Sequence, residues 1–210
     1  MLIPTIFQQV PFCIPRRGIL HIGAHKCEED ELYRTIGITE DNILWIEANP
    51  DLIQPERKNM FQAVISNQDN DIVEFKITNN GESSSILNLK THLIEHPHIH
   101  EVKRLKLKTT TLNTFYQDHQ IPLDRYDFIN LDIQGAELLA LQGATSILPY
   151  VTAIYTEVNE KELYENCGLM DELDQFLKNY HFIRILTSMT KHGWGDALYV
   201  KIGDTSLFTE

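Results

Sequence analysis

The sequence predicts a single α/β domain built around a parallel sheet. Apolar runs of strand length, such as Ile19–Ile22 and Ile43–Glu47, alternate with helical patterns, which is typical of consecutive strand-helix-strand units. Right-handed crossovers between such units give a parallel sheet whose ligand-binding edge lies at the carboxyl ends of the strands. The 210 residues, 42% of them hydrophobic, are enough for one ordinary core.

The composition excludes several classes of protein. A net charge of −12 and a pI near 5.1 oppose binding to nucleic acid or to an anionic membrane, because both need a basic face. Cys13, Cys27 and Cys167 are widely spaced without a C-x-x-C pair, so neither a disulfide framework nor a thiolate zinc site is indicated. The start of the chain has neither a basic stretch nor a long apolar run. We therefore expect no signal peptide, no membrane span and a cytoplasmic protein.

Residues 1–17 are expected to form an N-terminal arm that lies on a domain of residues 18–204. Pro4, Pro11 and Pro15 oppose regular structure in the arm, while its apolar side chains need covering.

The remaining elements alternate along the chain until a terminal hairpin. Expected strands cover residues 18–22, 43–47, 62–65, 72–78, 102–108, 126–132, 151–158, 182–186 and 197–202. Expected helices cover residues 28–36, 49–59, 136–148 and 170–179, and another begins within 109–116. The run 102–108 alternates apolar and basic residues, as an edge strand does. No internal repeat or linker divides these elements, which favours one domain.

The first strand ends in a corner that suits a nucleotide-like or carboxylate-bearing ligand. Gly23 lets the backbone pass close to a ligand, and free N–H groups at the start of the next helix face the same point. In such units an acidic side chain about 20 residues further on accepts hydrogen bonds from the two ribose hydroxyls. Glu47, which closes the second strand, has this position. The sheet edge would bring Gly23, Glu47 and Ile65–Ser66 together.

A second corner follows the strand that ends in Asp132. A carboxylate at this edge could bind the ammonium of a cofactor or take a proton from a substrate. Glu137 lies in the first turn of the next helix, where it has either a functional role or only a favourable interaction with the helix dipole. The polar run Asn79–Ser85 is expected to form an ordered loop over the site.

Four histidines, His92, His96, His98 and His100, lie in a short span. His92 and His96 would share one face of a helix, so a metal site is conceivable. Pro97 interrupts any helix there, and carboxylate or cysteine ligands at firm spacing are absent, which favours a solvated loop and no metal. One of these histidines could still act as a base.

Five ordered blocks of sequence resemble the FkbM family of S-adenosylmethionine-dependent methyltransferases. They are His21–His25 (HIGAH), Ile46–Pro50 (IEANP), Asn79–Ser85, Asp132–Glu137 (DIQGAE), and Glu157-Val with Glu162-Leu-Tyr164. The resemblance runs through nearly the whole chain. It implies the Rossmann-like, seven-stranded class I methyltransferase sheet, mostly parallel with an antiparallel last strand and with helices on both faces.

The resemblance also implies S-adenosylmethionine as cofactor and transfer of its methyl group to an oxygen, often on a sugar. Glu47 would bind the ribose, residues 64–66 would border the adenine, and Asp132 with Gln134 would face the reacting end. The full set implied for the cofactor is His21, Gly23, Ala24, His25, Glu47, Ala48, Asn49, Val64, Ile65, Ser66, Asp132 and Gln134. Two residues depart from common methyltransferase loops: His21 replaces an acid, and Cys27 replaces a small residue.

The catalytic base and the acceptor are less well defined. Asp132, His25 and His92 are the candidate bases, and the position at a strand end favours Asp132. Polar and aromatic residues at the expected mouth favour a sugar, a nucleotide sugar or a glycan, because hydroxyls pair with polar side chains while ring faces lie on aromatics. This acceptor set is Asn80, Ser83, Ser84, Ser85, Glu157 and Trp194, with Tyr155 beside it.

Two alternative functions remain at this stage. Gly23 with Glu47 would also suit an NAD-dependent oxidoreductase, although the glycines that let a pyrophosphate approach are absent. The other alternative is a non-catalytic nucleotide-binding module, which the intact Glu47 and Asp132 disfavour. A homodimer stays open.

Overall fold

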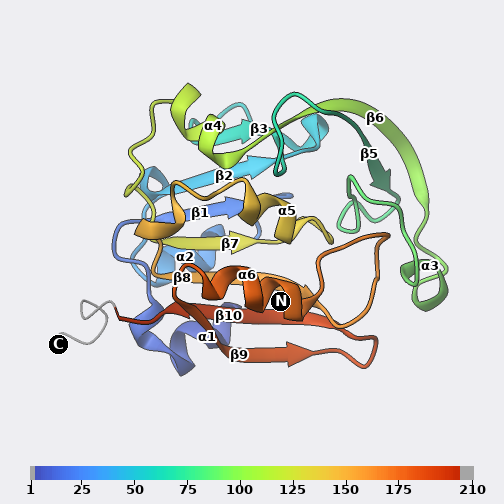
Figure 1. The fold of residues 1–210 in the computed structure, drawn as a ribbon. Helices are drawn as coiled ribbons and strands as arrows, with labels where there is room; N and C mark the ends of the chain where they lie inside the picture. Colours follow the sequence, from blue (N-terminus) through green and yellow to red (C-terminus); the bar gives the residue numbers. More distant parts are fainter. Residues whose placement is uncertain (1–2, 204–210) are drawn as a thin grey trace.

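The computed structural model describes residues 3–203, and its centre is a seven-stranded sheet (Figure 1). The strands are β1 Ile19–Ile22, β2 Ile43–Glu47, β3 Met60–Gln62, β7 Phe128–Leu131, β8 Ala153–Asn159, β9 Phe182–Met189 and β10 Trp194–Lys201. Their order is β3-β2-β1-β7-β8-β10-β9. The first five strands in this order pair in parallel, whereas β10, the last strand of the chain, is antiparallel to both β8 and β9. This confirms the predicted fold class.

Helices cover both faces of the sheet because its buried strands present apolar side chains on both sides. In β1, Leu20 and Ile22 face the core under α4 Leu112–Asp118, α5 Glu137–Gln142 and α6 Met170–Lys178. Ile19 faces the opposite core, which α1 Ile3–Gln9 and α2 Asp30–Thr35 cover. Each fully buried aliphatic side chain contributes roughly 1.5–3 kcal/mol. The continuous apolar runs are therefore what holds both layers on the sheet.

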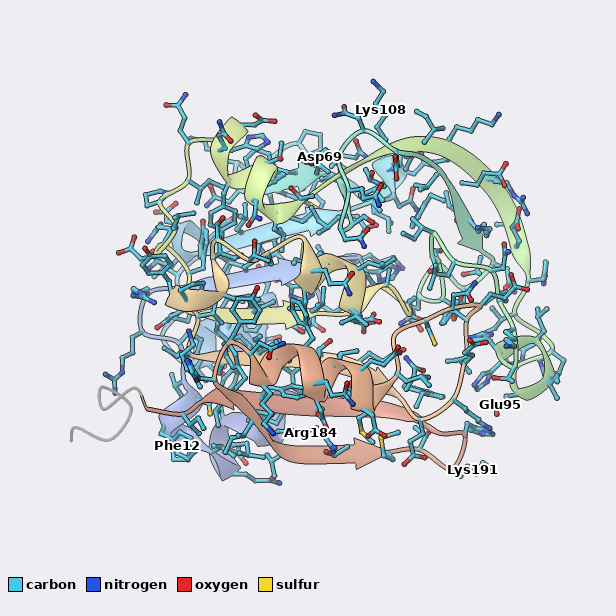
Figure 2. All side chains as sticks on the ribbon, viewed as in Figure 1. Phe12, Asp69, Glu95, Lys108, Arg184 and Lys191 are labelled. Carbon is cyan, nitrogen blue, oxygen red and sulfur yellow. The ribbon has the colours of Figure 1, made fainter. Side chains whose placement is uncertain are left out.

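A small second sheet projects from the carboxyl edge of the main one (Figure 1). It has the order β4-β6-β5, with β4 Val64–Ile65, β5 Ile72–Thr78 and β6 Glu101–Thr110. Since β4 pairs only with the end of β6, residues 102–108 pair with β5 alone and have the open edge that their alternation predicts. The short helix α3 His92–Glu95 lies beyond this sheet, where Figure 2 labels Glu95. The Oε2 atom of Glu95 lies 3.5 Å from Nδ1 of His192, in the turn between β9 and β10.

Several predicted elements differ from the structure. Residues 49–59 form only the 3-10 turn η3 Pro50–Leu52, because Pro55 disfavours the helical conformation of the residue before it. The strand predicted at residues 62–65 is instead two short strands, β3 and β4, in different sheets. The helix predicted to reach Leu148 ends at Gln142, and the 3-10 turn η4 Leu148–Tyr150 follows. Two further 3-10 turns are η1 Pro11–Cys13 and η2 Glu40–Asn42.

The arm is more regular than predicted. Helix α1 forms because Pro4 lies in its first turn, where the missing N–H would have no helical partner in any case. Ile6, Phe7 and Val10 are buried against the sheet, as their apolar character indicated. Residues 1–2 of the arm and residue 204 of the domain lie outside the described residues, and the division into arm and domain stays a prediction.

One buried carboxylate joins the arm to the sheet. Asp127, directly before β7, is 3% exposed and accepts hydrogen bonds from the backbone N–H groups of Arg16, Arg17 and Gly18 at 3.0–3.2 Å. These contacts set the point at which the chain enters β1, next to β7.

Replacing this carboxylate should destabilise the protein. In Asp127→Ala the three N–H groups lose their acceptor, and only those of the exposed arginines regain water, so we expect a loss of roughly 2–3 kcal/mol in the free energy of unfolding. Asp127→Asn keeps one oxygen acceptor and should lose less. Urea denaturation measures both, and an alanine variant as stable as the wild type would exclude this role.

Candidate active site

The loop after β1 is held between its two neighbouring strands. Gly23 has φ +89°, and a Cβ atom there would lie 1.8 Å from the carbonyl oxygen of Asp132. On the other side, the N–H groups of Gly23 and Ala24 donate to the carbonyl of Ile46 at 2.9 and 3.1 Å. The turn therefore requires glycine, and it brings the ends of β1, β2 and β7 to one point.

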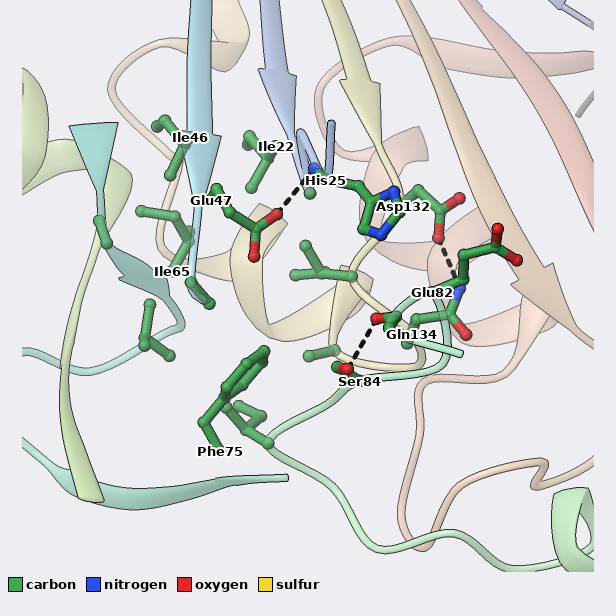
Figure 3. A pocket seen from close by; sticks show the side chains of 18 residues that line it. Ile22, His25, Ile46, Glu47, Ile65, Phe75, Glu82, Ser84, Asp132 and Gln134 are labelled. Atoms are coloured by element: carbon green, nitrogen blue, oxygen red, sulfur yellow. Dashed lines mark hydrogen bonds between the residues drawn. The ribbon is translucent and has the colours of Figure 1, made fainter. Parts of the chain in front are cut away.

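Glu47 is fixed at the end of β2 by backbone donors. Its Oε2 accepts from the N–H of His25 at 2.8 Å (Figure 3), and its Oε1 accepts from the N–H of Asn49 at 2.7 Å. Burial raises the pKa of this carboxyl, and the two donors oppose that rise. Each oxygen keeps a lone pair for a further donor, so the carboxylate can accept from two ligand hydroxyls without moving.

A narrow cavity of about 70 Å³ adjoins Glu47. Most of its wall is apolar, as Figure 3 shows for Ile22, Ile46, Ile65 and Phe75, with Val64 and Ile86 completing this wall. The loop at Gly81–Ser84 covers the other side. The combination of an apolar slot with a carboxylate at one end suits a flat heterocycle attached to a ribose.

A wider cleft of about 460 Å³ continues from this cavity. The two spaces share Gly23, His25, Glu82, Asp132 and Gln134. The cleft is further lined by Ala24, Glu28, Glu29, Asn80, Ser83, His92, His96, Ile99, Glu157, Leu163, Trp194 and Asp196. One continuous space thus runs from Glu47, past Asp132, to Trp194.

Gln134 connects the acids of the cleft to its surroundings. It has φ +57°, a conformation that few residues other than glycine adopt. Its Nε2 donates to Asp132 Oδ1 at 2.7 Å and to Glu157 Oε2 at 3.1 Å, while its Oε1 accepts from the hydroxyl of Tyr164 at 2.6 Å. Ser85 Oγ donates to the carbonyl of Gln134 at 2.8 Å. The loop over the site is therefore connected to the strand-end acids through Gln134.

Three acids lie close to this residue, of which Glu137 and Glu157 are buried and Asp132 is half-buried. Burial raises the pKa of Asp132 to about 6, that of Glu137 to about 7, and that of Glu157 well above its usual range. Glu137 Oε1 accepts from the N–H groups of Ile133 and Gly135 at 2.9 and 3.1 Å. It lines neither cavity, so of its two open roles the structure favours that of holding the loop after β7.

The three candidate bases lie on one cleft. Asp132 shares its wall with His25, whose Nδ1 is 2.7 Å from Glu28 Oε1, and with His92, which is 4% exposed. Burial lowers the pKa of His92, as does the neighbouring His96, so His92 is neutral near pH 7. Within the described part of the chain, its Nδ1 has no hydrogen-bond partner.

Some predicted site residues lie away from both cavities. His21 points to the opposite face of β1 from Ile22, against Tyr33 and Trp45, where burial lowers its pKa to about 3. Asn49 contributes its N–H to Glu47, and Ser66 is buried beside Gly143. The geometry does not support direct ligand contacts for these residues.

The same holds for part of the acceptor set. Tyr155 is 2% exposed in the core under α1 and is not at the mouth, because it lies deeper along β8 than Glu157. Ser85 faces a separate cavity on the other side of the loop and acts through its bond to Gln134. Asn80, Ser83, Glu157 and Trp194 do line the cleft, and Ser84 lines the narrow cavity.

Several residues of the site were missed from the sequence. Phe75 and Ile86 wall the narrow cavity, and Glu82 and Asp196 reach the cleft. Phe75 belongs to an alternating strand and gave no signal of a site. Tyr164 lies in the last of the five resembling blocks, which was its only signal.

Two features are absent from residues 3–203, the part of the chain that the structure describes. No group of three or more histidine, cysteine, aspartate or glutamate side chains in this range could hold a metal ion. None of the helices within it combines the length and the apolar character needed to cross a membrane.

Comparison with known proteins identifies the family. The profile of the methyltransferase FkbM domain matches residues 21–184, which include both corners and every lining residue of the cleft except Trp194 and Asp196. The chain belongs to this family. This confirms the predicted family, whose domain is described as that of a methyltransferase.

The individual proteins to which the chain is similar match only part of it or match it at low identity. The 2-O-methyltransferase NoeI of Sinorhizobium fredii is 32% identical over 100 residues, which make up 48% of this chain and 38% of NoeI. The chain therefore matches well under half the length of that relative. Magnesium protoporphyrin IX methyltransferase (ChlM) from Synechocystis PCC 6803 matches 94% of this chain in two structures, at 9% and 8% identity with TM-scores of 0.45 and 0.47. These cover 78% and 79% of the ChlM chain.

The buried Glu137 should make stability depend on pH. A carboxyl whose native pKa of about 7 exceeds its ordinary 4.5 stabilises the fold when protonated, and this contribution is lost as the pH rises to about 7. Glu137→Gln keeps the acceptor oxygen but never ionises. We expect the two melting temperatures to lie closest together near pH 5 and the variant to melt several degrees higher at pH 8, with roughly 2–4 °C for each kcal/mol in a chain of this size.

Thermal melts at both pH values measure this gap, with the exposed Glu160→Gln as control. If the difference in melting temperature between Glu137→Gln and the wild type did not change from pH 5 to pH 8, the assignment would be contradicted.

The loop at residues 79–85 should respond to the cofactor. Pockets for ligands of this size measure roughly 300–1,000 Å³, whereas the part of the space beside Glu47 holds only about 70 Å³, so we expect its wall at Gly81–Ser84 to move when the cofactor binds. We expect hydrogen exchange in residues 79–85 to slow when S-adenosylhomocysteine and a sugar are bound. The buried strand β7 serves as the invariant control, and identical loop exchange in all states would remove the lid role.

Proposed function

We propose that the protein transfers the methyl group of S-adenosylmethionine to a hydroxyl of a sugar, either free, linked to a nucleotide or within a glycan. The observation that supports this most directly is the continuous space from Glu47 past Asp132 to Trp194. One end of it suits an adenosine and the other is large enough for a hexose.

The residues of the first part fit the cofactor. Glu47 is placed to accept from the ribose hydroxyls, with Val64 and Ile65 beside the adenine. Further along, Asp132 and Gln134 meet the amino-acid part, and a carboxylate there favours an ammonium. Gly23 has no side chain, so the turn after β1 can lie against the carbonyl of Asp132 beside this passage.

When bound, S-adenosylmethionine supplies a methyl group whose bond to the sulfonium breaks, with the electron pair left on sulfur, as the acceptor oxygen bonds to carbon. The protein then has to align the acceptor and remove the hydroxyl proton. Asp132 is our choice of base, because its pKa of about 6 lies near neutral pH and Gln134 occupies only its Oδ1. His25 and His92 are the alternatives.

The acceptor part of the space combines polar and aromatic groups. Asn80 and Ser83 offer amide and hydroxyl partners from the loop, and Trp194 offers a flat face from β10. A sugar uses both kinds of contact. The name of NoeI, a 2-O-methyltransferase, supports transfer to oxygen.

The cofactor assignment predicts a loss of affinity in Glu47→Ala. Removing hydrogen bonds to a charged group should weaken S-adenosylhomocysteine binding by roughly 1.5–3 kcal/mol in a protein that still folds by circular dichroism. Glu47→Gln keeps one oxygen and should lose less, and the exposed Glu56→Ala is the control. Unchanged affinity in a folded Glu47→Ala protein, measured by calorimetry, would refute the ribose assignment. If the wild-type protein bound NAD more tightly than S-adenosylhomocysteine, an oxidoreductase would be favoured.

The acceptor class is tested by transfer of a labelled methyl group. Panels of nucleotide sugars, glycans, small phenols and peptides are offered with labelled S-adenosylmethionine, and label is expected on sugars. Label on a phenol or a peptide but on no sugar would refute the proposal.

A further inference from the structure

Tyr164 supports the turn after β7 from a position outside the cleft. Its side chain is fully buried, and it lines neither the narrow cavity nor the wide cleft. A Cβ atom on Gly135 would lie 3.1 Å from both Cβ and Cδ2 of Tyr164, so the tyrosine packs directly on the turn that Gln134 and Gly135 form. Its hydroxyl donates to Gln134 Oε1 at 2.6 Å. Tyr164 can therefore act on the cleft only through its neighbours.

The groups at the two ends of the Gln134 amide fix its orientation. One end lies 2.7 Å from Asp132 Oδ1 (Figure 3) and 3.1 Å from Glu157 Oε2. An ionised carboxylate only accepts hydrogen bonds, so this end has to be the NH₂ group, whose two hydrogens serve the two acids. The oxygen at the other end then needs a donor, and the hydroxyl of Tyr164 supplies it. With the amide reversed, its oxygen would lie against Asp132.

The hydroxyl of Tyr164 is suited to this role. The only other oxygen to which it is bonded is the carbonyl of Ser83, at the longer distance of 3.4 Å. Burial raises the pKa of Tyr164 well above its usual range, so the hydroxyl keeps its proton near neutral pH. Without this donor the amide oxygen of Gln134 loses its partner, and the amide can turn away from the acids.

The backbone of Gln134 is held as firmly as its side chain. Its φ of +57° is unfavourable for a residue other than glycine, and its carbonyl accepts from Ser85 Oγ at 2.8 Å. A residue kept in such a conformation has its side chain directed by the surrounding contacts. These contacts direct the amide of Gln134 at two carboxyl groups.

The amide nitrogen has its largest effect on Asp132. Burial raises the pKa of this carboxyl to about 6, and the hydrogen bond from Gln134 is the strongest influence that lowers it. Among the described residues that line the cleft, none is a lysine or an arginine. The titratable groups that act on Asp132 or share its cleft are Glu29, Glu82, Glu137, Glu157, Tyr164 and Asp196, with His25, Glu28, His92 and His96 further along the wall. Most of them are acids, so the amide is the main described group that favours an ionised Asp132.

We propose that Tyr164 is a positioning residue for the methyl transfer: its hydroxyl fixes the amide of Gln134, which holds Asp132 Oδ1 and leaves Oδ2 to take the proton of the acceptor hydroxyl. This rests on the proposed function, in which Asp132 is the base. Tyr164 itself touches neither the cofactor space nor the acceptor space.

The titration of Asp132 tests this without a cofactor or an acceptor. In the free protein, ¹³C NMR of labelled aspartate carboxyl groups gives the pH midpoint of Asp132, assigned with Asp132→Asn. Tyr164→Phe should raise this midpoint by roughly one pH unit, because the ionised form loses a firmly held donor. Tyr150→Phe, at an exposed tyrosine of η4, is the matched control and should leave the midpoint unchanged.

Further variants connect the effect to Gln134. Gln134→Met has no amide and should raise the midpoint at least as much, and adding Tyr164→Phe to it should change nothing more. Placing 3-fluorotyrosine at position 164 keeps the hydroxyl and makes it a stronger donor, so the midpoint should move down, which tests the proposal even if Tyr164→Phe does not fold. Circular dichroism and retained affinity for S-adenosylhomocysteine establish that each variant folds.

The reaction should show the same change. With the midpoint of Asp132 one pH unit higher, kcat of Tyr164→Phe should fall roughly fivefold at pH 6 and stay within roughly twofold of the wild type at pH 8.5. KM for the acceptor should change little. A tyrosine with a purely structural role would instead lower kcat by the same factor at both pH values.

Three outcomes would overturn the inference: equal midpoints in Tyr164→Phe and the wild type, a further rise when Tyr164→Phe is added to Gln134→Met, or a loss of kcat that does not depend on pH. The proposed function fails separately, if no sugar accepts a labelled methyl group. The midpoint of Asp132 in the free protein is measured without any acceptor, so the two failures are distinguishable.

Discussion

The contact between the ends of β1 and β7 is the constraint on which the site depends. Gly23 can lie against the carbonyl of Asp132 only because it has no Cβ, which would come within 1.8 Å of that oxygen. This approach places the turn after β1 directly beside the acid after β7, and the bonds from Gly23 and Ala24 to Ile46 add the end of β2. Parallel pairing brings the strand ends to one edge, and because Gly23 has no side chain the two ends can touch.

The acids of the site are held in two different ways. Glu47 and Glu137 each accept two backbone N–H groups from loops that follow strands: those of Glu47 come from the loops after β1 and β2, and those of Glu137 from the loop after β7. These bonds offset part of the cost of burying a carboxyl and fix the loops around it. Asp132 and Glu157 instead share the amide of Gln134, which leaves both more open to a ligand. The molecule thus separates acids that support the loops from acids that face the cleft.

The small sheet and its loops complete the space that the main sheet begins. Phe75 of β5 and the loop at Gly81–Ser84 close the cofactor side, while His92 of α3 walls the acceptor side. Through Ser85, the loop is bonded to Gln134, and through Gln134 to both cleft acids. A movement of this loop would therefore shift hydrogen-bonded side chains in both parts of the site.

The sequence by itself determined the sheet, its two corners and the positions of Glu47 and Asp132. These depend on local signals: apolar runs of strand length, a glycine where φ must be positive, and acids that end strands. Parallel pairing then dictates that such strand ends meet. The polar run at residues 79–85 indicated a loop over the site, and the resemblance to the family added Gln134.

Only the tertiary structure decided which side chains reach the cleft. His21 and Tyr155 had plausible positions in the sequence, yet each points into the core under α1 and α2. Asp196 meets Glu157 only because β10 pairs with β8 in one particular register, and Phe75 reaches the cofactor side only because a second sheet lies over the edge. Such contacts join residues far apart in the chain, and local patterns carry no information on them because register and packing are set by the fold as a whole.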